Sequence, residues 1–285
     1  KIIKVGRTHL QDATPLSLGQ EFSGYQSQLQ DCISRIRNAL NEIYFLAQGG
    51  TAVGTGINTK AQFGTHMAKE ITRFTGISFV EASNHFEAQG AQDAAVETSG
   101  ALKTVAVSLS KIANDIRWLG SGPRAGLGEL ILPAVQPGSS IMPGKTNPVI
   151  CEAMIQACAQ VIGNDLAITI GGQGGVFELN LMLPLIAHNL TNSITILSNG
   201  TIVFTEKLII GLKANKEKCA GYIEGSLAMC TSLAPVIGYD KAADIAYKAY
   251  NSGKTVREIA IEENVLDKDK LNELLDPLSM TKPSK

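Results

Sequence analysis

Apolar residues recur at helical spacing along much of the chain. The clearest stripe is Leu102, Val105, Ala106, Leu109, Ile112, Ala113, Ile116 and Leu119. Steps of one or three residues keep these side chains on one face of a helix, while the polar residues between them fall elsewhere on the wheel. The pattern therefore predicts an amphipathic helix, which Gly120, Gly122 and Pro123 end.

Three further segments predict long helices. They cover residues 19–48, ended by Gly49 and Gly50; Asn147 to about Ile170; and Leu181 to Leu212. The second is apolar nearly all round, with Asn147 as its N-cap and Pro148 as its first helical residue. Such a helix belongs inside a bundle. Strand signals are few, and residues 51–59 read as a loop or extended segment. We therefore expect an all-α fold, a bundle of long helices.

The character of the sequence changes after residue 213. Segments become shorter, Lys and Glu become denser, and residues 238–265 read as short amphipathic helices with glycine breaks. We expect two domains, a central helical-bundle domain at 1–212 and a small helical C-terminal domain at 213–285. Helices of the length predicted before residue 213 favour an elongated bundle whose apolar faces continue into other subunits.

Composition narrows the class of protein. The chain has 285 residues, 44% of them hydrophobic and 18% charged, with a net charge of −1 and no basic block. This balance is globular and disfavours nucleic acid as a partner. The five cysteines form no C-x-x-C motif, which indicates reduced thiols in a cytoplasm-like compartment and no zinc site. No long run of uncharged apolar residues predicts a membrane span. The first residue is Lys1, so we expect a piece of a longer chain or a processed product.

The loop GSSIMPGKTNP at 138–148 precedes the apolar helix directly. Its glycines give backbone freedom, Ser139 and Ser140 offer hydroxyls, and Lys145 offers a cation. The following helix adds free N–H groups and a partial positive charge at its N-terminus. Together these features predict a site for an anion, either a carboxylate or a phosphate, in which a serine could act as a base. The alternative is a plain surface loop that leads into a helix.

The stretch GRTHLQDATPLSLGQEF at 6–22 places His9 shortly before a turn expected at Pro15. A histidine titrates near neutral pH and suits acid–base chemistry. The other histidines, at positions 66, 85 and 188, are interpreted as structural or surface residues. Glu152, early in the apolar helix, is either a helix-start carboxylate or a group that holds a histidine in one tautomer.

These stretches together resemble one family. The loop is similar to the fumarase/aspartase signature G-S-S-x-M-P-x-K-x-N. The segments GRTHLQDATPLSLGQEFSGY, GGTAVGTGINT, KIANDIRWLGSGPRAGLGELILP and IGYDKAA narrow the resemblance to class II fumarate hydratases. The resemblance runs over the family's central helical domain and its small C-terminal domain. Family members carry an N-terminal domain before GRTH that supplies further carboxylate-binding loops, so residues 1–285 alone are expected to be inactive.

The resemblance implies a homotetramer that reversibly adds water to fumarate, in the anti sense, to give L-malate. It implies no metal and no organic cofactor, with three subunits contributing to each site. Ser139 matches the base that removes the C3 proton, His9 the histidine that handles the water, and Glu152 its carboxylate partner. The residues that match substrate-carboxylate contacts are Thr8, Ser140, Lys145, Thr146 and Asn147.

Alternatives remain at this point. Aspartate ammonia-lyase shares the loop and the tetramer, although Gly144 and the NHFEA segment at 84–88 favour a fumarase. An inactive, bundle-forming fragment is a second alternative. A mitochondrial matrix location replaces the cytoplasm if the source is eukaryotic.

Overall fold

The chain forms two compact units in a computed structural model that describes residues 1–283. One unit contains Lys1–Gln26, Trp118–Leu132 and the chain from Leu212 onward, and the other contains Ser27–Arg117 and Pro133–Gly211. We refer to them as unit 1 and unit 2 and describe each by itself. The predicted division into a domain at 1–212 and another at 213–285 stays a prediction.

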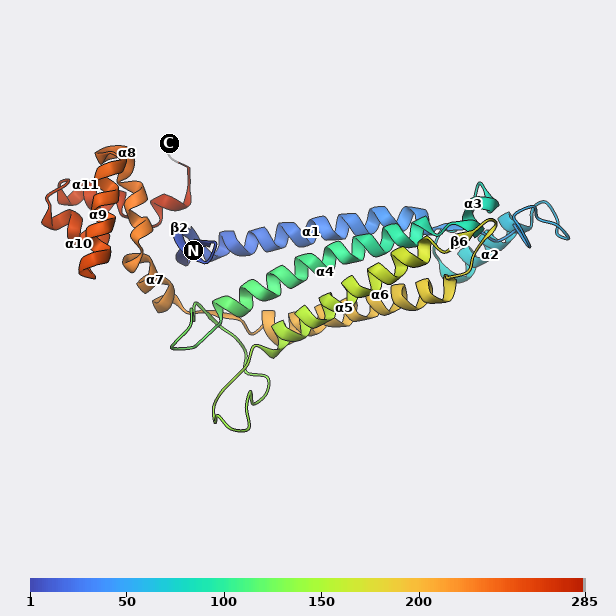
Figure 1. Cartoon of the computed structure of the whole chain (residues 1–285), viewed down its shortest axis with the longest axis horizontal. Coiled ribbons are helices and arrows are strands. Elements are labelled where there is room, and N and C mark those ends of the chain that lie inside the picture. Colours follow the sequence, from blue (N-terminus) through green and yellow to red (C-terminus); the bar gives the residue numbers. More distant parts are fainter. Residues whose placement is uncertain (284–285) are drawn as a thin grey trace. The chain divides into compact units, whose positions relative to one another are not determined.

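Four long helices run side by side in the bundle (Figure 1). They are α1 (Leu18–Ile43), α4 (Asp93–Leu119), α5 (Val149–Gly172) and α6 (Leu183–Phe204). The predicted long-helix architecture is therefore confirmed. The boundaries differ: α1 ends before the glycine pair at 49–50, and α6 gives way to a π-helical turn, Thr205–Ile209, before residue 212.

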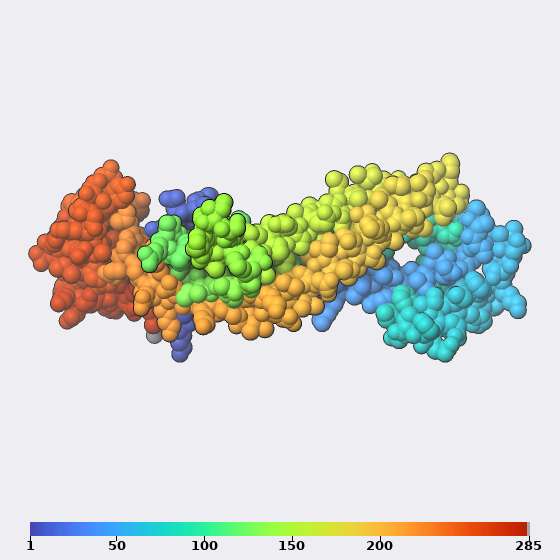
Figure 2. All heavy atoms as spheres, turned by 90° about the horizontal axis from the view of Figure 1, so that it is seen from below, coloured from blue at the N-terminus to red at the C-terminus, as the bar shows by residue number. Residues whose placement is uncertain are grey.

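The stripe predicted along 102–119 lies on the buried side of α4. Ala106 and Ala113 are fully buried, and Ser108 Oγ lies 3.4 Å from Cys32 Sγ of α1. In α5 the apolar residues lie on both sides, because Cys158 and Ile168 are buried whereas Leu166 remains 62% exposed. Figure 2 shows α5 and α6 along one face of unit 2. By length and composition alone α5 could cross a membrane, a weak indication that buried bundle helices share.

A polar contact connects α4 with α5 inside the bundle. Asp165 is 5% exposed and accepts hydrogen bonds from Ser99 Oγ at 2.8 Å and Lys103 Nζ at 2.6 Å. Buried polar groups of this kind are tolerated only when they are paired, and in some helical proteins they specify one register. The hydrogen bonds to Asp165 therefore hold α4 against α5, the helix that follows the loop at 138–147.

We expect Asp165→Ala to lower the free energy of unfolding by about 1–3 kcal/mol, because Ser99 is left buried without its partner. The control is Glu70→Ala, which removes one half of an exposed ion pair with Arg73 and is expected to change stability by less than about 1 kcal/mol. Urea denaturation measures both. Equal losses of unfolding free energy in the two variants would show that the buried contact to Asp165 stabilises the protein no more than an exposed ion pair does.

The remaining elements of unit 2 are short. They are β3 (Phe45–Leu46) paired in parallel with β4 (Val80–Glu81), α2 (Phe63–Thr75), α3 (His85–Gly90), and the antiparallel pair β6 (Gly175–Val176) and β7 (Leu179–Asn180). Residues 51–59 form turns, as the loop expectation for that segment predicted. His66 lies exposed on α2, as expected.

Unit 1 begins with a hairpin that the sequence reading missed. Strands β1 (Ile3–Thr8) and β2 (Gln11–Ser17) pair antiparallel with an irregularity between Val5 and Gly6. Val5 is fully buried in a core formed mainly by the C-terminal helices, with Ile223, Leu233 and Ile245 among its members. The hairpin is therefore anchored in the core of this unit.

The rest of unit 1 is mainly helical. Its elements are β5 (Leu130–Ile131) paired with β8 (Lys213–Ala214), α7 (Lys216–Gly225), a 3-10 helix (Leu227–Ser232), α8 (Ala234–Ile237), α9 (Tyr239–Ser252), α10 (Val256–Glu262), α11 (Lys268–Leu274) and a last 3-10 turn (Ser279–Thr281). Short helices separated by breaks after residue 213 are what the sequence predicted.

Candidate functional site

The loop at 138–147 presents a serine oxygen to backbone donors. Ser139 Oγ accepts hydrogen bonds from the amides of Ile141 at 3.2 Å and Met142 at 3.0 Å. Two N–H groups aimed at one oxygen favour its negatively charged form over its neutral form. The local backbone therefore directs two N–H donors at the hydroxyl oxygen of Ser139, the side chain that the sequence singled out as a candidate base.

The loop is closed by its own backbone. The amide of Lys145 donates to Met142 O at 3.2 Å. Pro143 and Gly144 lie between them, and Gly144 has φ +78°. This matches a type II β-turn, whose third residue needs a positive φ and hence usually glycine. The amide of Gly138 then donates to Lys145 O at 2.8 Å, which brings the two ends of the loop together.

The predicted N-cap at Asn147 is wrong. Helix α5 begins at Val149, its N-cap is Pro148, and no side chain caps it. Asn147 Nδ2 instead donates to Gly138 O at 2.9 Å. A side chain at Gly138 would meet Asn147 N and Lys145 O at 2.8 Å, so only glycine fits there. Asn147 therefore holds the loop closed.

The charged and polar groups around this turn are accessible. Ser140, Lys145 and Thr146 are exposed, and Glu152 is half-buried in the first turn of α5. Within residues 1–283, neither the Lys145 ammonium nor the Glu152 carboxylate has an ion-pair partner or a side-chain hydrogen bond. An exposed, unpaired cation beside a helix N-terminus attracts anions. The loop can therefore receive a carboxylate.

Thr8 and His9 lie at the tip of the hairpin in unit 1. The turn expected at Pro15 is wrong: it lies at His9 and Leu10, with φ +53° and +61°, whereas Pro15 lies within β2. Positive φ at both central residues is the geometry of a type I′ hairpin turn, which normally uses Asn or Gly. A non-glycine residue there costs about 1–3 kcal/mol, and such strain concentrates at functional sites.

Each unit therefore carries one part of the predicted site. The loop of unit 2 brings together Ser139, Ser140, Lys145, Thr146 and Asn147, with Glu152 in the helix that follows directly. The hairpin of unit 1 carries Thr8 and His9 on consecutive positions. His85, interpreted as structural, has its Nε2 atom 3.2 Å from Gln48 O and 3.4 Å from Glu81 Oε1.

Three buried thiols and the half-buried thiol of Cys230 are unsuited to nucleophilic chemistry. Burial raises the pKa of Cys151, beside Glu152, to about 12, and burial raises the pKa of Cys158 to about 11. Burial also raises the pKa of the thiols of Cys219 and Cys230. Because the thiolate is the reactive form, these four residues stay protonated and inert at neutral pH.

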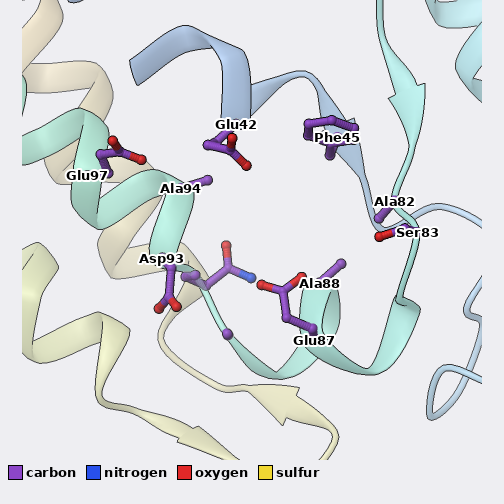
Figure 3. Close-up of a pocket in the computed structure, with 11 residues that line it drawn as sticks. Glu42, Phe45, Ala82, Ser83, Glu87, Ala88, Asp93, Ala94 and Glu97 are labelled. Carbon is purple, nitrogen blue, oxygen red and sulfur yellow. The ribbon is translucent and has the colours of Figure 1, made fainter. Parts of the chain in front are cut away.

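A separate cavity of about 520 Å³ lies in unit 2 between the ends of α1 and α4 and the segment around α3. Glu42, Glu87, Asp93 and Glu97 surround it in Figure 3, and its lining has no Lys, Arg or His. A lining of one negative sign repels a dicarboxylate. No group of three His, Cys, Asp or Glu side chains in the described part of the chain is arranged as a metal site.

Comparison with known protein families gives two matches. Residues 1–163 match a family described as "Lyase", and residues 229–282 match "Fumarase C C-terminus". The chain is 53% identical over 279 residues to "Fumarate hydratase, mitochondrial" of Dictyostelium discoideum, covering 98% of this chain and 58% of the relative. It is 52% identical over 283 residues to the Homo sapiens protein of the same name, covering 99% and 56%. The chain therefore spans little more than half the length of these relatives.

Two solved structures also match this chain over nearly its whole length. The class II fumarase from Schistosoma mansoni matches with a TM-score of 0.96 and 41% identity, covering 100% of this chain and 62% of that one. A structure of "fumarate lyase:delta crystallin" from Brucella melitensis bound to cobalt matches with a TM-score of 0.94 and 45% identity, covering 99% and 61%. The all-helical bundle is thus a fold already seen in fumarases.

Proposed function

This chain belongs to the class II fumarase family of the fumarase/aspartase superfamily, and from that premise we propose that the whole protein reversibly adds water to fumarate to give L-malate. The family match over residues 1–163 supports the assignment. The observation that carries the chemical proposal is the pair of amides that donate to Ser139 Oγ.

Ser139 acts as the base at C3. In the dehydration direction its oxygen takes the proton from C3 of malate, and the electron pair moves into the adjacent carboxylate, which becomes an aci-carboxylate with two negative oxygens. A carbon acid of this kind is weak, so its ionisation needs donors placed where the charge develops. The amides of Ile141 and Met142 stabilise the serine alkoxide that performs the step.

Lys145 and the start of α5 receive the carboxylate that accumulates charge. The unpaired ammonium of Lys145 supplies the positive charge, and the hydroxyls of Ser140 and Thr146 supply donors. The N-terminus of α5 adds a partial positive charge in the same place. Asn147 contributes by holding the ends of the loop together through the bond from its Nδ2 atom to Gly138 O.

His9 handles the water at C2, with Thr8 as a further carboxylate contact. In the dehydration direction an imidazolium donates a proton to the C2 hydroxyl, which leaves as water, and the C2–C3 double bond forms. In hydration the neutral imidazole takes a proton from the attacking water. Glu152 holds the imidazole in the tautomer that the step requires. Addition from opposite faces by His9 and Ser139 gives anti stereochemistry.

Assembly of several copies completes each site. We expect a homotetramer in which segments of three subunits meet, so that Thr8 and His9 of one copy serve the loop of another. Large apolar side chains on the bundle helices support this, because they are exposed in the single chain: Val107, Ile162, Leu166, Ile170 and Ile202. Large apolar side chains left exposed on helices of this kind support burial in an interface between subunits.

The assay that tests the function uses the full-length protein. Fumarate consumption followed by its ultraviolet absorbance, with L-malate identified as the product, is the expected result. Aspartate as substrate should release no ammonia, since the similar relatives are fumarate hydratases and the ammonia-lyase alternative is not favoured. Ammonia release without fumarate hydration would contradict the proposal. We expect the active protein in a reducing compartment, the cytoplasm or the mitochondrial matrix.

Residues 1–285 expressed alone should assemble without turnover. The exposed bundle surface drives association, whereas the chain spans about 56% of its relatives and should lack carboxylate-binding groups that the rest of the protein supplies. Analytical ultracentrifugation is expected to give an oligomer, and a fumarate assay is expected to give no steady rate. A steady hydration rate from this purified chain would overturn the expectation.

A further inference from the structure

We propose that Arg7, held between Glu129 and Tyr222, is a positioning residue that fixes the strained turn carrying His9. This inference rests on the proposed function, because it assigns Arg7 a task in that same reaction. Arg7 lies on β1, two residues before His9. The contacts that support the inference all lie within unit 1.

Glu129 binds the guanidinium group of Arg7 in the bidentate manner. Arg7 Nη1 donates to Glu129 Oε2 at 2.9 Å and Arg7 Nη2 donates to Glu129 Oε1 at 3.0 Å. Glu129 is 0% exposed, and its own backbone carbonyl accepts from the amide of Asn215 at 2.8 Å. Paired N–H···O bonds fix orientation as well as distance. The carboxylate is therefore a rigid anchor that determines where Arg7 lies.

An aromatic ring holds the face of the same guanidinium. Arg7 Cζ lies 5.7 Å from the centre of the Tyr222 ring, and the Tyr222 hydroxyl donates to Gly126 O at 3.2 Å. Burial works against the charged form of Arg7, but the hydrogen bond and charge of Glu129, with a smaller contribution from Asp12, leave its pKa raised. The guanidinium is thus held in its plane by Glu129 and on its face by Tyr222.

A second cation lies between the buried carboxylate of Glu129 and the half-buried carboxylate of Glu21. Lys4 is 1% exposed, and its Nζ atom lies 3.5 Å from Glu129 Oε2 and 3.3 Å from Glu21 Oε2. Two cations therefore face two carboxylates, which makes removal of any one of them unfavourable. Because Lys4 and Arg7 lie on the same strand, both ends of β1 are fixed to Glu129.

These contacts explain how the strained turn at His9 and Leu10 keeps its geometry. His9 and Leu10 both have positive φ, a strained geometry that persists only when surrounding contacts over-determine it. Arg7 pairs with Asp12 across the hairpin and Thr8 pairs with Gln11, so a shift of Arg7 moves the last rungs before the turn. A displacement of the reacting group by about 1 Å can lower a rate on the order of 10²-fold. Arg7 thereby controls the position of the His9 imidazole.

The test uses full-length protein with Arg7→Lys and Glu129→Gln. Lys keeps the charge and loses the paired bonds, while Gln keeps the shape and loses the charge. We expect each to lower kcat on the order of 10- to 100-fold. The matched control is Arg257→Lys in the same unit, where Arg257 pairs with Glu224 at 2.8 Å far along the chain from the hairpin. The control should leave kcat within about twofold of wild type.

A second background separates positioning from general instability. In a protein already carrying His9→Asn, Arg7→Lys should lower the remaining rate by less than about twofold, since the group that it positions is gone. If Arg7→Lys lowered the rate by the same factor in both backgrounds, it would act only by lowering the fraction of folded protein. That result would overturn the inference. So would unchanged kcat in folded Arg7→Lys and Glu129→Gln proteins.

Alternative variants are available if one substitution prevents folding, and the wild-type assay tests the proposed function separately. If Glu129→Gln gives no folded protein, Arg7→Lys and Tyr222→Leu, which removes the ring from the face of the guanidinium, carry the test on their own. A wild-type protein without fumarate hydration would instead refute the proposed function before any variant is compared. The two failures are therefore distinguishable.

Discussion

Full-length protein carrying Ser139→Ala should lose about 10²–10⁴-fold in kcat with little change in KM, the scale expected when a proton-transfer group is removed. The reason lies in the loop geometry. The oxygen that accepts hydrogen bonds from the amides of Ile141 and Met142 disappears, whereas the exposed Lys145, the proposed carboxylate contact, remains. Substrate binding is then preserved and the C3 proton has no base. Steady-state kinetics with L-malate measure both constants.

A control serine shows that the loss is specific. Ser34→Ala removes an exposed hydroxyl on α1 that donates to Gln30 O within its own helix, and it should leave kcat within about twofold of wild type. Wild-type turnover in Ser139→Ala would rule out Ser139 as the base. A rise in KM with unchanged kcat would assign Ser139 to binding instead.

Full-length protein carrying His9→Asn should show a loss of similar size, about 10²–10⁴-fold in kcat. An asparagine tolerates positive φ, so the turn at His9 and Leu10 is kept while the imidazole is removed. Steady-state kinetics with L-malate measure the loss.

His66→Asn provides the matched control for this change. His66 is exposed on α2 in unit 2, and its replacement should leave the rate as in wild type. If His9→Asn keeps full activity, its role in handling the water is refuted.

The bundle was predictable because helical periodicity is a local property of the sequence. The stripe from Leu102 to Leu119 shows which face of α4 is buried, and the apolar character of α5 on all sides predicts both its buried and its exposed apolar residues. Ends of helices were less predictable. Nothing in the pattern near residue 204 distinguishes an α-helical turn from the π-helical turn that replaces it.

The hairpin was missed because its residues contradict the local rules. Pro15 lies inside a strand, where it is tolerated beside the irregular pairing at Val5, and the turn uses His9 and Leu10 where Asn and Gly are expected. Burial of Val5 among helices far along the chain determines the strand, and that contact cannot be read from a window of sequence. The same applies to Arg7, whose partner Glu129 is remote in sequence.

The loop shows the limit of capping rules. Asn147 before Pro148 has the pattern of an N-cap, yet the carbonyl of Gly138 binds its side chain instead. Closure of the loop decides this competition, since the amide of Gly138 also donates a hydrogen bond to Lys145 O. The anion site itself was expected from residue types, because two glycines, two serines and one lysine before a helix indicate such a site, and it stays a prediction.

A crystal structure of the full-length His9→Asn protein with L-malate bound would show directly whether the 138–147 loop receives the substrate. We expect Ser139 Oγ to lie about 3–3.5 Å from C3 of malate and still to accept hydrogen bonds from the amides of Ile141 and Met142. We also expect one malate carboxylate to contact Lys145. Malate bound elsewhere, or a loop turned away from the ligand with nothing near Lys145, would refute these roles.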